Sequence, residues 1–413
     1  GMRGRPLLYT SYEADQGLLN TTTKKVMLGL FLLVLVLIPF QVIPSLRFLG
    51  EDDWLRLQVT TAIFVIGALG LNLLTGLAGQ VSLGHAFFMG VGAYTAAWLG
   101  GPVDGPLLGL GLPIWIWLPA AGIVAALIGV AVGPTAVRVR GLYLAIVTLG
   151  LVFIGDYVFR NWESLTGGAQ VGRDFPPLVF RWWKEDPPVI DFTTPSIWFG
   201  VELSGLAKTF FLLAMLAGIF TLLAKNLQRT RVGRAFMSIR DRDIAAEIMG
   251  VNEFAYKLLA FGVSSFYAGI AGALLASFVT RVIPERWDLF LSVQFIAIIL
   301  IGGAGTVAGV ILGSAFVVLL PRVVQDFTLW LQSVALEGEG IGSAIANVFV
   351  ATTPNDFGLV NTFAGVGPGL SVAQLNLVLY GLLIIGFLIF EPLGLFGIWL
   401  RIRNYWKGWP FTY

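Results

Sequence analysis

Long apolar stretches separated by short charged segments follow one another along most of the chain. Since about 20 apolar residues cross a bilayer as a helix, each stretch of this kind predicts at least one membrane span. Single spans are expected within 26–46, 105–137, 141–159, 209–224, 258–280 and 375–390.

Two further stretches are too long for one helix. Residues 57–103 carry a single charged or histidine side chain, His85, so they predict two spans hinged near Thr75–Gly84. Residues 289–321 have no charge and are interrupted at Gly302–Thr306, which predicts two short helices broken at the glycines. The pattern therefore predicts an all-α, polytopic transmembrane helix bundle of about ten spans.

The charges indicate how this bundle is oriented. With ten spans, one side of the membrane holds 16 of the 26 Lys and Arg residues. They lie in 1–25, 134–140, 225–257 and the C-terminal tail. Because Lys and Arg concentrate in cytoplasmic loops, both termini are expected in the cytoplasm. We expect a cytoplasmic segment 1–25, a transmembrane domain 26–396 and a cytoplasmic tail 397–413.

Two segments on the outer side are long. Residues 161–205 are rich in tryptophan, proline and acids, and 322–374 are glycine-rich with a candidate surface helix near 328–350. Each is either a variable loop or a docking surface for an external partner.

Composition narrows the class of protein. Of 413 residues, 57% are hydrophobic and 12% charged, against about 25% charged in an ordinary soluble domain. The net charge of +2 offers no footprint for nucleic acid, and zero cysteines with one histidine leave no thiolate or multi-histidine metal site. The sequence has no phosphate-binding loop of the G-x-x-x-x-G-K-[ST] type, so no ATP site of that kind is expected.

Polar and glycine residues cluster within the apolar regions. Such groups at membrane depth are tolerated when they are buried in protein or face a watery path. The polar and glycine-rich segment 70–86 is therefore either a tight helix contact, with polar side chains as interhelical links, or part of a translocation path. The path candidates are Asn72, Thr75, Gln80, Ser82, His85, Gly302 and Gly303. His85 by itself equally fits a hydrogen-bonded packing residue.

The most charge-dense stretch, 228–254, lies on the expected cytoplasmic side. Its apolar spacing predicts one helix over 228–250 that ends at Gly250 as a C-cap. It is either a solvated loop or a lever that a partner subunit grips. The residues expected to take part are Arg234, Arg240, Asp241, Asp243, Ala245, Ala246, Glu247 and Gly250.

This stretch resembles the coupling loop of ABC importer permeases, with its E-A-A-x-x-x-G motif. Ala245, Ala246 and Gly250 match, whereas Ile244 stands where the glutamate is expected, so Asp243 or Glu247 would supply the acidic contact. Further matches are Asn72–Gly76, Gly79-Gln80, Ser82–Ala86, Gly90–Tyr94, Leu165–Gly168, Gly302–Thr306 and the tail from Glu391-Pro392. In order and over 57–413, they resemble the larger permease type of the branched-chain amino acid ABC transporter family.

The resemblance implies a permease subunit in a bacterial inner membrane, with no catalytic residues and no cofactor of its own. Its partners would be membrane lipid, a second permease, two cytoplasmic ATPases that bind ATP, and an extracytoplasmic solute-binding protein. The cargo would be branched-chain amino acids or, as in relatives, urea, short amides or aromatic acids. The 322–374 insert is atypical of the family.

Two other classes compete with this interpretation. An ion-coupled secondary transporter needs ionisable groups at membrane depth, and the expected spans offer only His85 and Asp156. A membrane enzyme would need paired carboxylates or histidines, which the expected spans lack.

Overall fold

The computed structural model describes residues 22–103, 105, 107, 109–137, 142–183, 186–198, 200–336, 346–351, 359–361, 369–391 and 393–408. Most of the expected N-terminal segment, the end of the tail and much of the 322–374 insert lie outside these residues. The helices are α2 (Thr22–Leu37), η1 (Pro44–Gly50), α3 (Asp52–Leu71), η2 (Asn72–Leu77), α4 (His85–Gly100), α5 (Ile114–Val137), α6 (Leu142–Asn161), α7 (Glu163–Thr166), α8 (Gly168–Val171), α9 (Gly205–Arg229), α10 (Arg231–Asp241), α11 (Asp243–Ile248), α12 (Glu253–Val279), η3 (Pro284–Arg286), α13 (Leu289–Gly302), α14 (Val307–Leu336), α16 (Val372–Phe390) and α17 (Gly394–Gly408).

The apolar stretches of the sequence are helical. Within the described part of the chain, six helices are long and apolar enough to cross a membrane, and a shorter apolar segment lies in α16. The six are α3 with η2, α5, α6, α9, α12 and α14. The chain is therefore a mostly helical, multi-pass membrane protein, as the hydrophobic pattern predicts. Three other apolar helices, α2, α4 and α13, have only 16, 16 and 14 residues.

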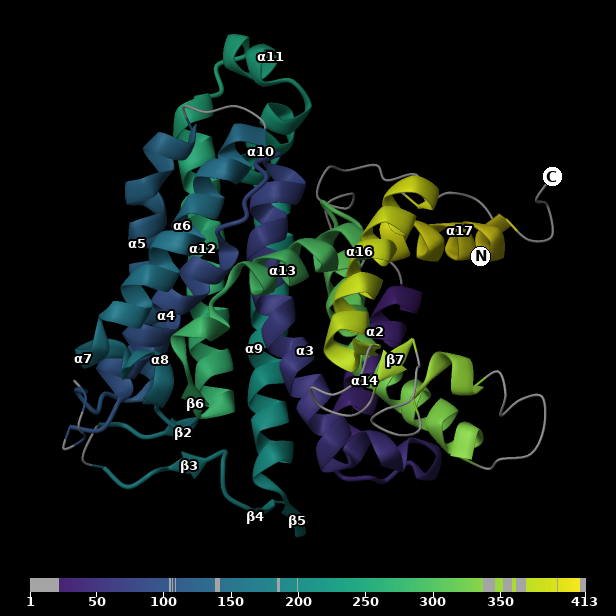
Figure 1. Cartoon of the computed structure of the whole chain (residues 1–413). Coiled ribbons are helices and arrows are strands. Elements are labelled where there is room, and N and C mark those ends of the chain that lie inside the picture. The colour runs from purple at the N-terminus through teal and green to yellow at the C-terminus, as the bar shows by residue number, and fades with distance from the viewer. Residues whose placement is uncertain are drawn as a thin grey trace.

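Helix α12 lies at the centre of a group formed with α3, α4 and α5 (Figure 1). Small residues bring these backbones together: a Cβ at Gly272 would lie 2.0 Å from the Met89 carbonyl oxygen of α4. A Cβ at Gly92 would likewise lie 2.2 Å from the Gly269 carbonyl oxygen. Gly272 belongs to a row of small residues at every fourth position of α12, Ser264, Ala268, Gly272 and Ala276, a spacing that allows close helix packing.

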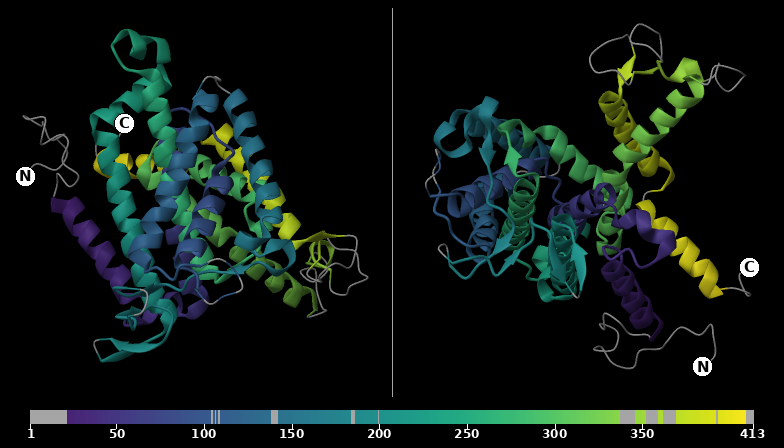
Figure 2. Two further views of the ribbon diagram at one scale, coloured as in Figure 1. Left: turned by 90° about the vertical axis from the view of Figure 1, so that its left-hand side faces the viewer. Right: turned by 90° about the horizontal axis from the view of Figure 1, so that it is seen from below.

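A second group, α13, α14, α16 and α17, extends away from the first. Seen from below, α3 and α13 join the two groups, and the later helices spread outward (Figure 2). Helix α13 packs on α14, which in turn contacts α3.

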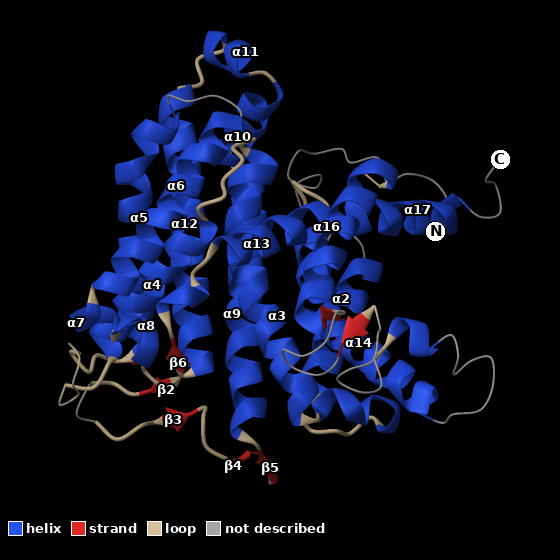
Figure 3. Cartoon of the chain, viewed as in Figure 1, coloured by secondary structure: helices blue, strands red, loops and turns tan. Residues whose placement is uncertain are grey.

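Short strands depart from the all-helical expectation. They form antiparallel pairs β1 (Arg173–Asp174) with β6 (Arg281–Val282), β2 (Val179–Phe180) with β3 (Ile190–Asp191) and β4 (Ser196–Trp198) with β5 (Val201–Leu203), and a parallel pair β7 (Val360–Asn361) with β8 (Leu370–Ser371). The first three pairs gather at the end of the bundle opposite α10 and α11 (Figure 3). We call this the strand end.

Two buried cations hold the strand end together. Arg173 is 2% exposed and donates to the Leu165 and Ala97 carbonyl oxygens at 2.6 and 2.7 Å. Lys208 of α9 is equally buried and donates to the Asp191 carbonyl and to Ser196 Oγ. Because burial disfavours the charged form, the pKa of Arg173 is lowered. The 161–205 segment is therefore fixed to the bundle by internal hydrogen bonds.

Helix α14 is longer than the short helix that the sequence predicts to end near Pro321. It continues to Leu336, so 322–336 is helical from its first residue and the surface helix expected near 328–350 begins inside α14. Proline removes the N–H that would pair with the carbonyl four residues earlier, here Val317. The Tyr380 hydroxyl of α16 donates to that oxygen at 3.0 Å, so the helix continues without an unpaired carbonyl.

Two other boundaries differ from expectation. Helix α2 begins at Thr22 and ends at Leu37, short of the expected 26–46, because Pro39 disfavours a helical residue before it and Pro44 starts η1. The expected boundary at 396/397 falls inside α17.

Candidate functional site

The expected hinge after α3 is a change of helix type. From Asn72 to Leu77 the chain forms a π-helix, a form that is frequent at functional sites, and regular helix resumes only at His85. Asn72 Oδ1 accepts the Gly305 N–H at 2.7 Å, which ties this segment to the turn between α13 and α14. A Cβ at Gly76 would lie 2.4 Å from the Gly305 nitrogen, so only glycine permits this approach.

The turn itself depends on glycine. Gly303 and Gly305 have φ of 119° and 82°, where L side chains are strained. Thr306 Oγ1 donates to the Gly303 carbonyl at 2.8 Å and accepts the Gly309 N–H at 3.1 Å. Gly302 lies against the Gly309 backbone, so Gly302 and Gly303 make close backbone contacts rather than facing open space.

Arg240 of α10 reaches these two breaks. Its Nη1 donates to the Gly76 carbonyl oxygen at 2.8 Å, and its Nε pairs with Asp241 at 3.0 Å. Its side-chain stem covers Gly79, where a Cβ would lie 2.8 Å from Arg240 Cγ. We call Asn72–Gly79, Gly303–Thr306 and the Arg240 side chain the glycine junction. It brings a residue of the charged loop into contact with both broken helices.

The charged loop forms two helices, not the single helix expected over 228–250. Arg242 has extended backbone angles and separates α10 from α11. Helix α10 packs inward through Phe236 and Ile239, which are 0% and 4% exposed, and Phe236 meets the Tyr256 ring edge-on. Its Arg234 Nη1 donates to the Arg229 carbonyl at 3.0 Å.

Helix α11 lies at the tip of the molecule, beyond the bundle (Figure 1). Gly250 ends it as expected: φ is +87°, its N–H donates to the Glu247 carbonyl, and the Val251 N–H donates to the Ala246 carbonyl. This is a Schellman motif. Ala246 is buried, whereas Asp243 is partly exposed and Ala245 and Glu247 are exposed.

Three large apolar side chains at this tip face outward. Ile244, Ile248 and Met249 are 62%, 80% and 83% exposed. Contiguous exposed apolar side chains beside charged ones are typical of interaction sites. We call these three residues the α11 tip.

The other expected path residues lie from η2, which holds Thr75, to the first residue of α4, His85. Gln80, Ser82 and His85 are all 5% exposed or less, and Thr75 Oγ1 donates to the Gln80 carbonyl at 3.0 Å. Ser82 Oγ accepts the Gly84 N–H at 3.2 Å. Neither polar atom of the Gln80 amide, nor His85 Nε2, has a hydrogen-bond partner among the described residues. The His85 ring instead packs on Phe295, with centroids 4.7 Å apart.

Two residues that the sequence pattern does not single out complete this region. Thr148 of α6 accepts the Leu83 N–H at 2.9 Å, and Gln228 at the end of α9 donates to the Gly305 carbonyl at 3.4 Å. Thr148 lies in an apolar helix and Gln228 at a charged loop, so nothing in their local sequence distinguishes them.

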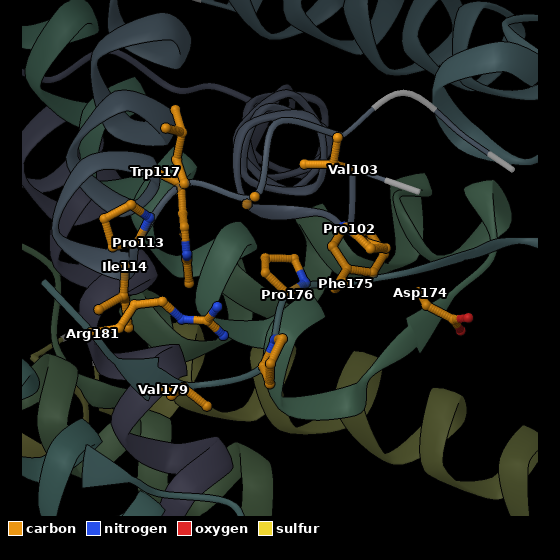
Figure 4. A pocket seen from close by; sticks show the side chains of 14 residues that line it. Pro102, Val103, Pro113, Ile114, Trp117, Asp174, Phe175, Pro176, Val179 and Arg181 are labelled. Carbon is orange, nitrogen blue, oxygen red and sulfur yellow. The ribbon is translucent and has the colours of Figure 1, made fainter. Parts of the chain in front are cut away.

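A cavity of about 640 Å³ lies at the strand end, between the α4–α5 connection and the β1–β2 segment. Trp117 and Arg181 both point into it (Figure 4). Part of its lining, from Asp174 to Arg181, belongs to the 161–205 segment, which the sequence predicts to be either a variable loop or a docking surface.

Comparison with known proteins gives a consistent result. A family model described as branched-chain amino acid transport system / permease component matches residues 54–388. The chain is 34% identical over 313 residues to the high-affinity branched-chain amino acid transport system permease protein LivM of Salmonella typhimurium, and 33% identical over 317 residues to LivM of Escherichia coli. Each alignment covers 75% of this chain and 70% of the relative. The ribose import permease protein RbsC of Haemophilus influenzae is 21% identical over 314 residues. No solved structure matches the chain.

Proposed function

Because the chain belongs to the branched-chain amino acid permease family of ABC importers, we propose that it carries branched-chain amino acids across a bacterial inner membrane. It is a multi-pass permease subunit, and ATP hydrolysis is the task of separate subunits in this family. The two LivM relatives, at 33–34% identity, favour amino acids over urea or short amides as cargo.

One observation carries the mechanism: the Arg240 Nη1 contact with the Gly76 carbonyl oxygen. Through it, the loop that bears the exposed α11 tip is bonded to the π-helical break of α3 and, through Asn72, to the turn before α14. A movement imposed on α10 and α11 is thereby delivered to two points where transmembrane helices are interrupted. ATP-driven closure of partner ATPases against the α11 tip would shift these helices between two states.

We further propose that α10 and α11 lie on the cytoplasmic side and that the strand end faces outward. In support, the 225–257 loop holds seven Lys and Arg residues, and basic residues favour the cytoplasmic side. Ten spans with both termini in the cytoplasm are part of this proposal; in support, ten apolar helices among the described residues, α2–α6, α9, α12–α14 and α16, overlap the expected spans.

The remaining partners follow from the family. A second permease subunit would complete the path, two ATPases would contact the α11 tip, and a solute-binding protein would dock at the strand end. Gln80 and His85 would border the path together with the neighbouring Ser82, because the unpartnered polar atoms of Gln80 and His85 are placed to meet cargo or water in another state.

The test is reconstitution in liposomes of this chain with the permease, ATPases and binding protein encoded beside it. Leucine uptake should need ATP and persist when ionophores collapse ion gradients, and the purified chain alone should hydrolyse no ATP. Uptake that follows an ion gradient without ATP would instead establish a secondary transporter.

A further inference from the structure

A second cavity, of about 330 Å³, lies between α3, α13, α14 and α16, away from the glycine junction. Its lining includes the apolar side chains of Leu57, Phe64 and Val318. It also includes the charged Glu285, Arg286 and Asp288, from η3 and the residues before α13. The volume lies within the range of small-molecule sites, about 300–1,000 Å³.

The charged residues of this cavity lie close to the strand end, where Arg286 and Asp288 are exposed and Glu285 is partly exposed. Helix α3 begins at the strand end, where Asp52 meets Ser204 after β5, and the cavity extends along it from Leu57 to Phe64. At 1.5 Å per residue these positions are about 8 to 18 Å from the start of α3. Glu285 follows Val282, the last residue of β6, by only three positions. The cavity therefore extends from charged groups near the strand end to apolar side chains on α3.

Glu285 has one carboxylate oxygen in use and one without a partner. Oε1 lies 3.2 Å from Arg160 Nη1, whereas the buried Oε2 makes no hydrogen bond among the described residues. A buried acceptor left unpaired costs free energy, so it calls for a donor. Trp287, 1% exposed and packed against Gly90, fixes the segment on which Glu285 stands.

The basic group is also available. Within the described residues, the Arg286 side chain forms no ion pair, although it lines the same cavity as Glu285 and Asp288. Asp288 is engaged as the N-cap of α13, where it accepts the Leu291 N–H at 2.9 Å. An ion pair between Arg322 and Asp53, at 3.6 Å, links α14 to α3 close to this cavity.

We propose that this cavity is a binding subsite for an amino acid with an aliphatic side chain, occupied during passage through the permease. The cargo's ammonium group would donate to Glu285 Oε2, its carboxylate would pair with Arg286, and its side chain would contact Leu57, Phe64 and Val318. The proposal rests on the import function proposed above and adds to it the place and the contacts of the cargo. A lipid tail would use only the apolar wall, and a metal cation only the acids. An amino acid with an aliphatic side chain carries both charges and an apolar group, and it can therefore use the acid, the base and the apolar residues of the cavity together.

The test compares Glu285→Gln with two matched variants in the reconstituted importer. Glu285→Gln should lower leucine uptake at least tenfold, while ATP hydrolysis stimulated by the loaded binding protein stays within twofold of the native complex. Arg160→Gln breaks the same ion pair but keeps Oε2, so uptake should stay within threefold. Asp326→Asn, at an exposed acid of α14 that lines neither cavity, should leave uptake unchanged.

If Glu285→Gln and Arg160→Gln lose uptake equally, the ion pair between the two residues is structural and the subsite proposal is wrong. Native uptake in Glu285→Gln would overturn the proposal as well. If the native complex fails to couple ATP to uptake, the proposed function itself is wrong, and this result is separate from the first two.

A second measurement tests the proposal even if Glu285→Gln fails to assemble. The chain has no cysteine, so Thr60→Cys places a single thiol in the cavity. Leucine-loaded binding protein should slow labelling of this thiol by a small maleimide at least threefold relative to the empty binding protein. Labelling at the same rate in both states would contradict the proposal.

Discussion

Helices α10 and α11 adjoin in sequence but differ in how they meet the rest of the molecule. Helix α10 is held by Phe236 and Ile239 in the bundle and by Arg240 at the glycine junction. Helix α11 buries only Ala246 among its six residues and exposes Ile244 and Ile248.

The difference assigns separate tasks to the two helices. A helix that is anchored in the bundle and hydrogen-bonded to one interrupted helix, which is itself bonded to a second, can transmit force, whereas an exposed apolar tip can receive it. The extended residue between them, Arg242, makes them two bodies rather than one lever. Predictions that alter one helix at a time therefore separate transmission from docking.

Phe236→Ala should have the largest effect, because it removes the aromatic anchor of α10. Deleting a fully buried phenylalanine costs about 3–5 kcal/mol. We expect faster hydrogen exchange throughout α10 and loss of uptake, measured by mass spectrometry and in proteoliposomes. Ile244→Ala, at an exposed position of α11, is the control and should leave α10 exchange unchanged.

Arg240→Met should disconnect α10 from the glycine junction while keeping the aliphatic stem. A hydrogen bond from a charged group contributes about 1.5–3 kcal/mol, and partial exposure of this side chain favours the lower end. ATPase subunits should still co-purify, and ATP hydrolysis should continue, but uptake per ATP should fall at least fivefold. The matched variant Arg242→Met should transport normally. Loss of ATPase binding in Arg240→Met would place this residue at the docking surface instead.

Gly250→Val should distort only the end of α11. No atom lies within 4 Å of an added Cβ, so the cost is the strained φ of +87°, about 1–2 kcal/mol. The protein should insert normally, with weakened ATPase association and little uptake, measured by co-purification and transport. Gly218→Val, at a helical glycine that also has open space, controls for the added side chain. Normal uptake with Gly250→Val would remove α11 from the mechanism.

Ile248→Ser combined with Met249→Ser should have the smallest effect on folding. Both side chains are at least 80% exposed, and surface substitutions change stability by about 0.5 kcal/mol or less. ATPase subunits should nevertheless dissociate more readily, because the apolar contact is lost. Glu247→Gln tests whether charge contributes: stronger loss in that variant would identify the contact as ionic.

The hydrophobic pattern predicts much of this fold and only part of the site. Apolar length places the spans, and Gly302–Thr306 places the break before α14, because both depend on local composition. The partner of Arg240 is Gly76, 164 residues away, and local spacing carries no information on such a contact. Arg240 makes an exposed ion pair with its neighbour Asp241 in addition to this bond to backbone, and only the ion pair lies within reach of local sequence. The sequence likewise does not predict that Glu285 and Asp288 line a cavity, since a charged segment between two spans predicts a surface loop.

The hydroxyl contact from Tyr380 to Val317 also bears on biogenesis. Its two residues are 63 positions apart, so α14 leaves the ribosome and enters the membrane before α16 exists. Until then, the carbonyl that Pro321 leaves unpaired has no partner from α16, and lipid offers none. Helix α14 therefore reaches its final hydrogen bonding only when α16 inserts, so the assembly of this pair waits for the synthesis of α16.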